Sequence, residues 1–103
     1  MQLSGIQPFL KGLALSLLLS AAACETNPPV QEMSDARQAL TVAKEAGAAE
    51  RAAFHFKAAQ DYLENAERAL KLRDYTEARR DARQAKMKAL DALKAAEATD
   101  GAD

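Results

Sequence analysis

The sequence contains one cysteine, Cys24, and one histidine, His55, the residue types that most often carry covalent or metal chemistry. A tetrahedral zinc site needs four ligands, and neither a second histidine nor a second cysteine is available. We therefore expect His55 to be a partly exposed helical residue. Serine and carboxylate residues show no triad order, nucleophile elbow or phosphate-binding loop. The sequence predicts no enzymatic activity, no cofactor and no metal.

The residues before Cys24 form a segment of different composition from the rest of the chain. Lys11 is its only charged residue, and an uncharged run, GLALSLLLSAAA, follows from Gly12 to Ala23. That run is shorter than the about 20 residues of a membrane-spanning helix, and small residues end it. Residues 1–23 are therefore predicted to be a secretion signal rather than a transmembrane anchor.

Ser20 to Cys24, SAAAC, resembles the lipobox of bacterial lipoproteins. The resemblance implies that the Cys24 thiol receives a diacylglycerol, that cleavage occurs just before it, and that the mature cysteine carries up to three acyl chains. Glu25 follows in place of aspartate, which under the enteric sorting rule implies the periplasmic face of the outer membrane. The alternative is an ordinary secretory signal that leaves the thiol unmodified.

All 15 acidic residues, and all but one of the 14 basic residues, follow the secretion signal. Without a basic excess, nucleic acid is not an expected partner. Residues 24–33 contain adjacent prolines at Pro28 and Pro29 and no apolar period, which predicts an extended tether. A polyproline conformation from Cys24 to Ser34 could hold the domain up to about 30 Å from the bilayer.

Residues 34–97 show three helical patterns, predicted at 34–46, 52–72 and 75–97. Ser34 is the expected N-cap of the first, and Gly47 the expected stop. Asp74 and Glu77 have capping-box spacing at the start of the third. The pattern leaves open whether the first two helices are separate or continuous, and residues 98–103 are predicted to be a disordered tail.

Alanine occupies every core position of the third predicted helix, with a spacing that alternates between four and three residues. Methyl side chains allow a close approach between helix axes, so we expect close antiparallel packing against residues 52–72. The predicted fold is all-α, either a short three-helix bundle or a helical hairpin plus one helix. The six positions, which we call the alanine seam, are Ala78, Ala82, Ala85, Ala89, Ala92 and Ala96.

Residues 30–97 resemble the domain-of-unknown-function family 4398, which occurs in short proteobacterial lipoproteins. The resemblance implies a helical periplasmic domain and brings no known activity. The residues that carry it are Ala36, Ala39, Ala43, Gly47, Ala48, Phe56, Leu63, Ala66, Asp74, Tyr75, Ala78, Ala82, Ala85 and Ala89. The hairpin of the last two helices also resembles a tetratricopeptide hairpin, although Arg73 stands where the turn glycine is expected and a second repeat is missing.

Two surface features are candidate contact sites. Arg79, Arg83 and Lys86 fall on one side of the third helix, beside the alanine seam. They could form a strip that contacts anionic headgroups or an acidic partner, or they could be an ordinary solvated helix face. Phe54 lies off the apolar stripe of its helix and, if exposed, is a contact point for a partner protein or for headgroups.

These features together predict a lipid-anchored, non-enzymatic adaptor or structural spacer in the cell envelope, with a protein partner that the sequence does not identify. One alternative is a structural lipoprotein whose helices self-assemble. A second is a regulator or inhibitor of an envelope enzyme.

Overall fold

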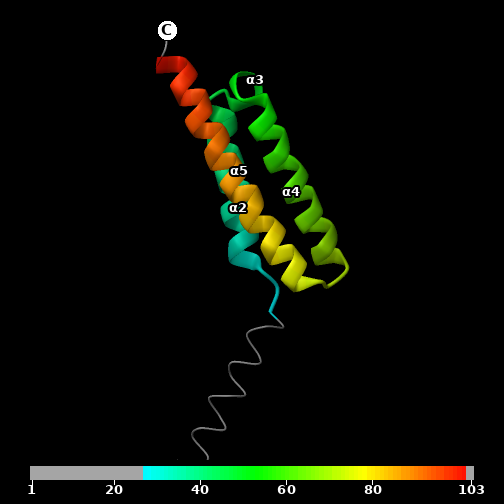
Figure 1. Ribbon diagram of the computed structural model, residues 1–103. Helices are drawn as coiled ribbons and strands as arrows, with labels where there is room; N and C mark the ends of the chain where they lie inside the picture. The colour runs from blue at the N-terminus through cyan, green and yellow to red at the C-terminus, as the bar shows by residue number, and fades with distance from the viewer. Residues whose placement is uncertain (1–26, 102–103) are drawn as a thin grey trace, which may run out of the picture.

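The computed structural model describes residues 27–101 as a bundle of helices (Figure 1). The helices are α2 (Val30–Glu45), the short α3 (Ala48–Arg51), α4 (Ala53–Lys71) and α5 (Tyr75–Gly101). The all-α class expected from the sequence is confirmed, with three long helices and one short one in the described range. None of the helices in this range is both long and apolar enough to cross a bilayer.

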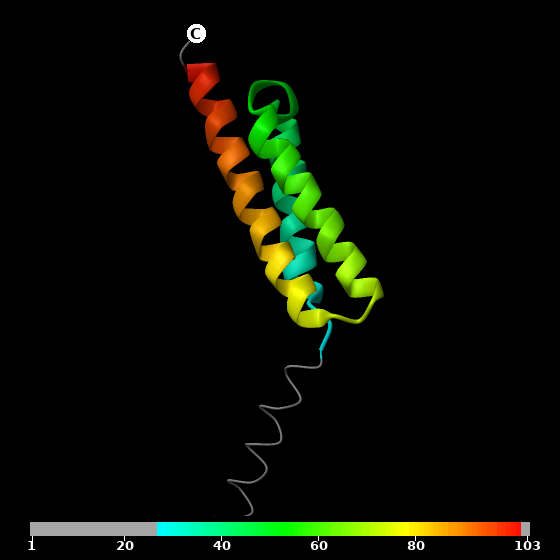
Figure 2. The ribbon, with the colours of Figure 1, turned by 45° about the vertical axis from the view of Figure 1, so that its right-hand side comes forward.

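Helix α5 is the centre of the packing. It lies along α4 and along α2 (Figure 2). Helices α2 and α4 contact each other much less than either contacts α5. The six residues of the alanine seam are completely buried, with 0% exposure each. The seam predicted from the spacing is therefore confirmed. Its methyl groups pack against residues of both α2 and α4.

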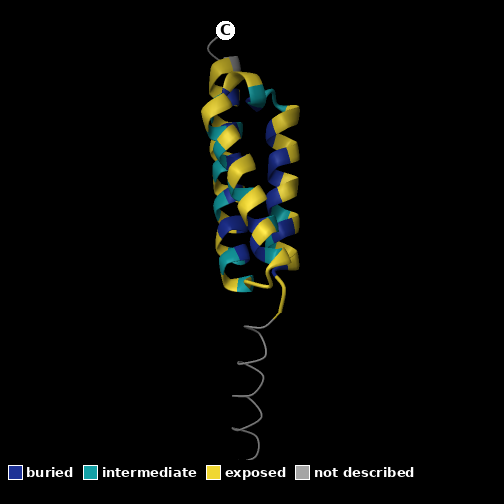
Figure 3. Ribbon diagram, turned by 90° about the vertical axis from the view of Figure 1, so that its right-hand side faces the viewer, coloured by how far each residue is buried: buried dark blue, intermediate teal, exposed yellow. Residues whose placement is uncertain are grey.

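The larger core side chains come from α2 and α4, because α5 presents mainly methyl groups to them. Leu40 and Phe56 pack with the C-terminal part of the seam, which is Ala89, Ala92 and Ala96. Met33 packs with Ala82 and Ala85, nearer the start of α5. Buried residues thus form a continuous line on the inner face of each helix (Figure 3). Each seam methyl contributes only about 0.8 kcal/mol by burial, so the tertiary fold depends strongly on these few larger side chains.

Helix α2 begins four residues before the predicted cap. Pro29 occupies the N-cap position, and its carbonyl accepts from the Met33 amide at 3.0 Å. Ser34 is an exposed residue inside the helix, so its predicted capping role is wrong. The helix starts early because Pro29 is buried and Glu32, in the first turn, complements the positive end of the helix dipole. The predicted tether of residues 24–33 is therefore wrong from Val30 onward, where the chain is already helical.

Helices α2 and α4 are separate. Gly47 adopts a left-handed conformation, with φ of 82°, and donates to the carbonyl of Lys44 at 3.0 Å. It ends α2 as the sequence predicts, because glycine has no Cβ to clash at positive φ. The four-residue helix α3 then fills the corner before α4 begins at Ala53.

The α4–α5 turn closes with a Schellman pattern. The Arg73 amide donates to Leu70 at 3.0 Å, and the Asp74 amide donates to Ala69 at 2.9 Å. Arg73 takes the left-handed position of this motif, with φ of 61°. The chain reverses here, so the α4–α5 hairpin geometry is confirmed.

Half of the predicted capping box forms at the start of α5. The Glu77 amide donates to the Asp74 carboxylate at 3.2 Å, but the Glu77 side chain pairs with Arg80 instead of returning to the Asp74 amide. The other end of α5 is also longer than predicted. It continues through residues 98–101, where the Thr99 hydroxyl donates to the Ala95 carbonyl at 2.9 Å, so the disordered tail is wrong for those residues.

Candidate functional site

The lipidation site Cys24 and the predicted signal of residues 1–23 lie outside the described residues. The described chain begins at Asn27, at the end of the bundle that also contains the α4–α5 turn (Figures 1 and 2). The opposite end contains the Gly47 corner, α3 and the start of α4. We call these the tether end and the far end.

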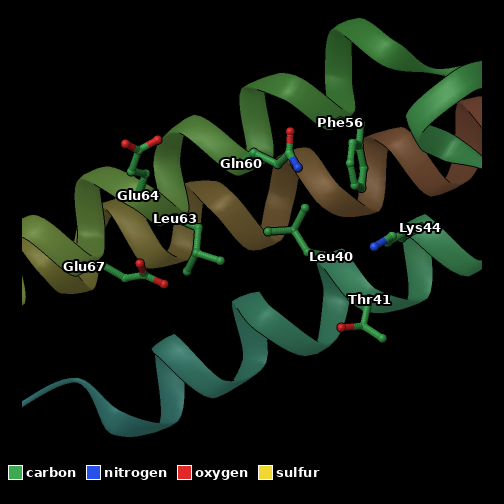
Figure 4. A pocket seen from close by; sticks show the side chains of 8 residues that line it. All are labelled: Leu40, Thr41, Lys44, Phe56, Gln60, Leu63, Glu64 and Glu67. Carbon is green, nitrogen blue, oxygen red and sulfur yellow. The ribbon is translucent and has the colours of Figure 1, made fainter.

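A groove runs between α2 and α4, the two helices that α5 holds side by side. Leu40, Phe56 and Leu63 form its apolar floor, and its volume is about 280 Å³ (Figure 4). It exists because α2 and α4 contact each other little, so their facing side chains are only partly covered. Leu63, predicted as a core residue, is half-buried there. The polar residues that line the groove are Thr41, Lys44, Gln60, Glu64 and Glu67.

The carboxylates of the groove already have cationic neighbours. Glu67 lies 3.6 Å from Arg37 across the α2–α4 gap, and Glu64 lies 3.6 Å from Arg68 on the same helix. Both carboxylates therefore have cationic partners at the rim of the groove. The chemistry that this groove offers is apolar contact with a rim of solvated charges.

Phe54 is the most exposed large hydrophobic residue among those described, at 83%. Phe54 lies off the buried stripe, as the sequence predicts, and its exposure meets the condition set for a contact point. Contact with a partner or with headgroups stays a prediction. Its ring packs edge-on against His55, with 5.6 Å between ring centroids. Lys57 lies one turn further along α4, and a 2.5 Å hydrogen bond to the Asp61 carboxylate raises its pKa above 10.5. The far end therefore presents an aromatic pair one turn away from a lysine that is paired with Asp61.

The three cations of the predicted strip have different environments. The Arg79 guanidinium donates to the Asn27 carbonyl at 3.0 Å and lies 3.4 Å from the Glu32 carboxylate. Arg83 lies 3.6 Å from the same carboxylate. Lys86 lines a separate shallow depression between α2 and α5. Arg79 and Arg83 thus hold the start of α2 against α5, an intramolecular role that sequence reasoning missed, and the anionic contact remains a prediction.

A charged depression lies on the outer face of the α4–α5 hairpin. Asp81 is buried there, at 7% exposure, and its carboxylate lies 3.9 Å from Arg80, which also pairs with Glu77. Among residues 27–99, no buried side-chain nitrogen or oxygen lacks a hydrogen-bond partner. No cluster of histidine and carboxylate side chains in the part of the chain that the structure describes could hold a metal ion. The depression is a structural ion-pair network.

Sequence reasoning also missed an exposed apolar residue at the tether end. Leu72 is 80% exposed in the α4–α5 turn, between the exposed Lys71 and Arg73. Its exposure was readable, because position 72 falls outside the alternating four-and-three spacing of Ala59, Leu63, Ala66 and Leu70, which would continue at position 73, and because two cations flank it.

No model of a known protein family matches this chain, and neither a curated protein nor a solved structure is significantly similar to it.

Proposed function

We propose that this protein is a lipid-anchored, non-enzymatic adaptor or structural spacer of the cell envelope. The lipobox-like residues before Cys24 support the anchor. Glu25, the residue after the cysteine, supports the periplasmic face of the outer membrane under the enteric sorting rule. The exposed aromatic residue at the far end supports contact with a protein partner. The resemblance to short periplasmic lipoproteins, which rests on the residues quoted above, is consistent with both.

The observation that carries the proposal is the separation along the bundle between the start of the described chain and the exposed Phe54. The described chain begins at the tether end, whereas Phe54 lies at the start of α4. The 18 residue steps from Phe54 to Leu72 correspond to about 27 Å of helix. An anchor on Cys24 therefore leaves Phe54 displayed well above the bilayer.

Self-assembly through the alanine seam has little structural support. All six seam residues are fully buried within one chain, so none is available to a second copy. Light scattering on the detergent-solubilised mature protein tests this directly. We expect a monomer, and a stable trimer or tetramer would favour the structural-lipoprotein alternative.

The adaptor function is tested by site-specific photo-crosslinking in intact membranes. A photoreactive amino acid at Phe54 is compared with one at Met87, an exposed apolar residue on α5 that is 58% exposed. We expect a discrete product from position 54 and none of that mass from position 87. The product should disappear in the Cys24→Ala variant while circular dichroism stays helical, because anchoring places the far end at its partner.

Equal capture from both positions would contradict the proposed contact site. Intact mass analysis of the mature protein tests the anchor separately. A mature chain that begins at Cys24 without acyl groups would overturn the anchored function, whatever the crosslinking shows. If position 54 captures an envelope enzyme whose activity falls on binding, the regulatory alternative replaces the spacer.

A further inference from the structure

The tether end of the bundle has apolar side chains that the fold does not bury. Leu72 in the α4–α5 turn is 80% exposed, and Val30, the first residue of α2, is 72% exposed. Val30 lies near Leu70, the last partly buried leucine of α4, since both line one small hollow. The start of α2 and the α4–α5 turn lie at the same end of the bundle (Figure 1). Both exposed aliphatic residues are therefore at that end.

Two cations flank Leu72, and neither is used by the fold. Lys71 and Arg73 are exposed, and neither forms an ion pair with a described residue. The neighbouring carboxylates are occupied, since Asp74 accepts from the Glu77 amide and Glu77 pairs with Arg80. An aliphatic residue between two long cationic side chains has the chemistry of a membrane interface, where the apolar group enters and the charges contact headgroup phosphates.

The backbone of the turn gives a second, independent reason to look for a role outside folding. Arg73 adopts φ of 61°, a conformation that costs a residue with a Cβ more than it costs glycine. The same Schellman motif would form with glycine at this position and would be more stable. Folding therefore favours neither an exposed leucine at position 72 nor an arginine at position 73.

The chain length between anchor and bundle determines how close this end lies to the bilayer. Only three residue steps separate Cys24 from Asn27, and they span at most about 10 Å. Asn27 cannot move far from the bundle, because its carbonyl accepts a hydrogen bond from Arg79 on α5. A bilayer that holds the acyl chains of Cys24 is thus within about 10 Å of the tether end, much closer than the about 30 Å expected for an extended tether.

From these observations we infer that the α4–α5 turn docks on the membrane, with Leu72 at the headgroup boundary and Lys71 and Arg73 against anionic phosphates. The occupant is the bilayer that carries the lipid anchor, so the inference rests on the proposed acylation of Cys24. The docked turn makes a second membrane contact besides the acyl chains. It orients the bundle so that its far end points away from the surface.

The test uses the full acylated protein in vesicles of phosphatidylethanolamine and phosphatidylglycerol. Cys24 is the only native cysteine and acylation blocks its thiol, so Leu72→Cys can be labelled with a polarity-sensitive fluorophore. Phe54→Cys is the matched control, since it replaces an equally exposed apolar residue at the other end of α4. We expect brominated acyl chains to quench the label at position 72 and to leave the label at position 54 unchanged.

A second variant separates headgroup attraction from simple proximity. Each cation near an anionic bilayer contributes about 1 kcal/mol, or about fivefold in an equilibrium. Replacing both Lys71 and Arg73 by glutamine should therefore reduce the equilibrium constant for docking by about 25-fold and lower the quenching at position 72. Both positions are exposed, so circular dichroism should remain unchanged.

The outcomes separate this inference from the proposed function. Equal or absent quenching at both positions, with acylation verified by intact mass, would overturn membrane docking while leaving the anchor intact. Quenching at position 72 that persists in the double glutamine variant would overturn the role of the two cations. An unacylated mature protein would overturn the anchor and this inference together.

Discussion

The two turns that reverse the chain each contain a residue in the left-handed conformation, but the residue type differs. At the far end the left-handed position belongs to Gly47, with φ of 82°, and at the tether end to Arg73, with φ of 61°. The glycine turn leads into α3, whose Ala48 is completely buried. The arginine turn instead leaves Leu72 80% exposed.

This difference shows which turn is explained by folding alone. Glycine at position 47 is the residue that a left-handed helix end favours, and the side chains that follow it pack on the bundle. Arginine at position 73 is disfavoured by its own backbone, and the leucine before it contributes nothing to the core. The tether-end turn therefore offers an aliphatic and two cationic side chains for an interaction outside the chain, and the bilayer contact that we propose would account for them.

The largest loss of stability should come from a substitution in the alanine seam, on which α2 and α4 both pack. Ala85→Leu inserts a branched side chain where the native methyl group is 0% exposed, and the close helix packing cannot accommodate it. We expect a loss of about 2–3 kcal/mol in the free energy of unfolding, measured by urea denaturation. The exposed Ala53→Leu variant is the control and should change stability little. Equal effects at the two positions would mean that the seam is not closely packed.

Gly47→Ala should be the next most damaging change. A Cβ at this position would lie 3.7 Å from the Arg51 side chain, an ordinary contact, so the cost comes from the positive φ alone. We expect a loss of about 1–2 kcal/mol in urea denaturation. A neutral result would show that the far-end turn can change conformation without cost.

Arg79→Gln tests the contact that fixes the tether end close to the anchor. It removes the half-buried ion pair with Glu32 and weakens the bond to the Asn27 carbonyl. We expect a loss of about 1 kcal/mol, with faster amide exchange confined to the first turn of α2. Arg80→Gln, which breaks a more exposed pair with Glu77, should cost only a few tenths of a kcal/mol. Identical amide exchange in the wild type and in Arg79→Gln would mean that Arg79 does not hold the start of α2 against α5.

Arg73→Gly should have the smallest effect on stability and the opposite sign. Relief of the left-handed strain exceeds the extra unfolded-state entropy of glycine, so we expect a gain of about 0.5–1 kcal/mol in the free energy of unfolding. The same variant should reduce membrane docking, because it removes one cation. A variant that is less stable than the wild type would show that Arg73 supports the fold, and the contrast with Gly47 would be lost.

The sequence predicted the features that follow from periodicity and from local turn chemistry. All seam alanines, the Gly47 stop and the Asp74 hydrogen bond were readable, because each depends on spacing within a few residues. The early start of α2 was not readable, since it depends on the burial of Pro29 and on an ion pair between Glu32 and Arg79, which is distant in the sequence. Glu32 also engages Arg83, so the predicted cationic strip is partly used within the bundle.

The groove between α2 and α4 depends on tertiary structure in the same way. Leu63 follows the apolar stripe of α4, and periodicity alone assigns it to the core. Its half-buried state results from the limited contact between α2 and α4, which only the packing of both helices on α5 determines. The exposure of Leu72 is different, because it could have been inferred from its position between two cations outside the stripe.

The height of each end above the bilayer tests the central claim most directly. Donor fluorophores at Leu72→Cys and at Phe54→Cys in the acylated protein are compared by energy transfer to acceptors in the headgroups. An end-on molecule predicts that the donor at position 54 lies about 27 Å farther from the acceptor plane than the donor at position 72. Equal distances would mean that the bundle lies flat on the membrane, and would contradict both the display of Phe54 and the docking of the α4–α5 turn.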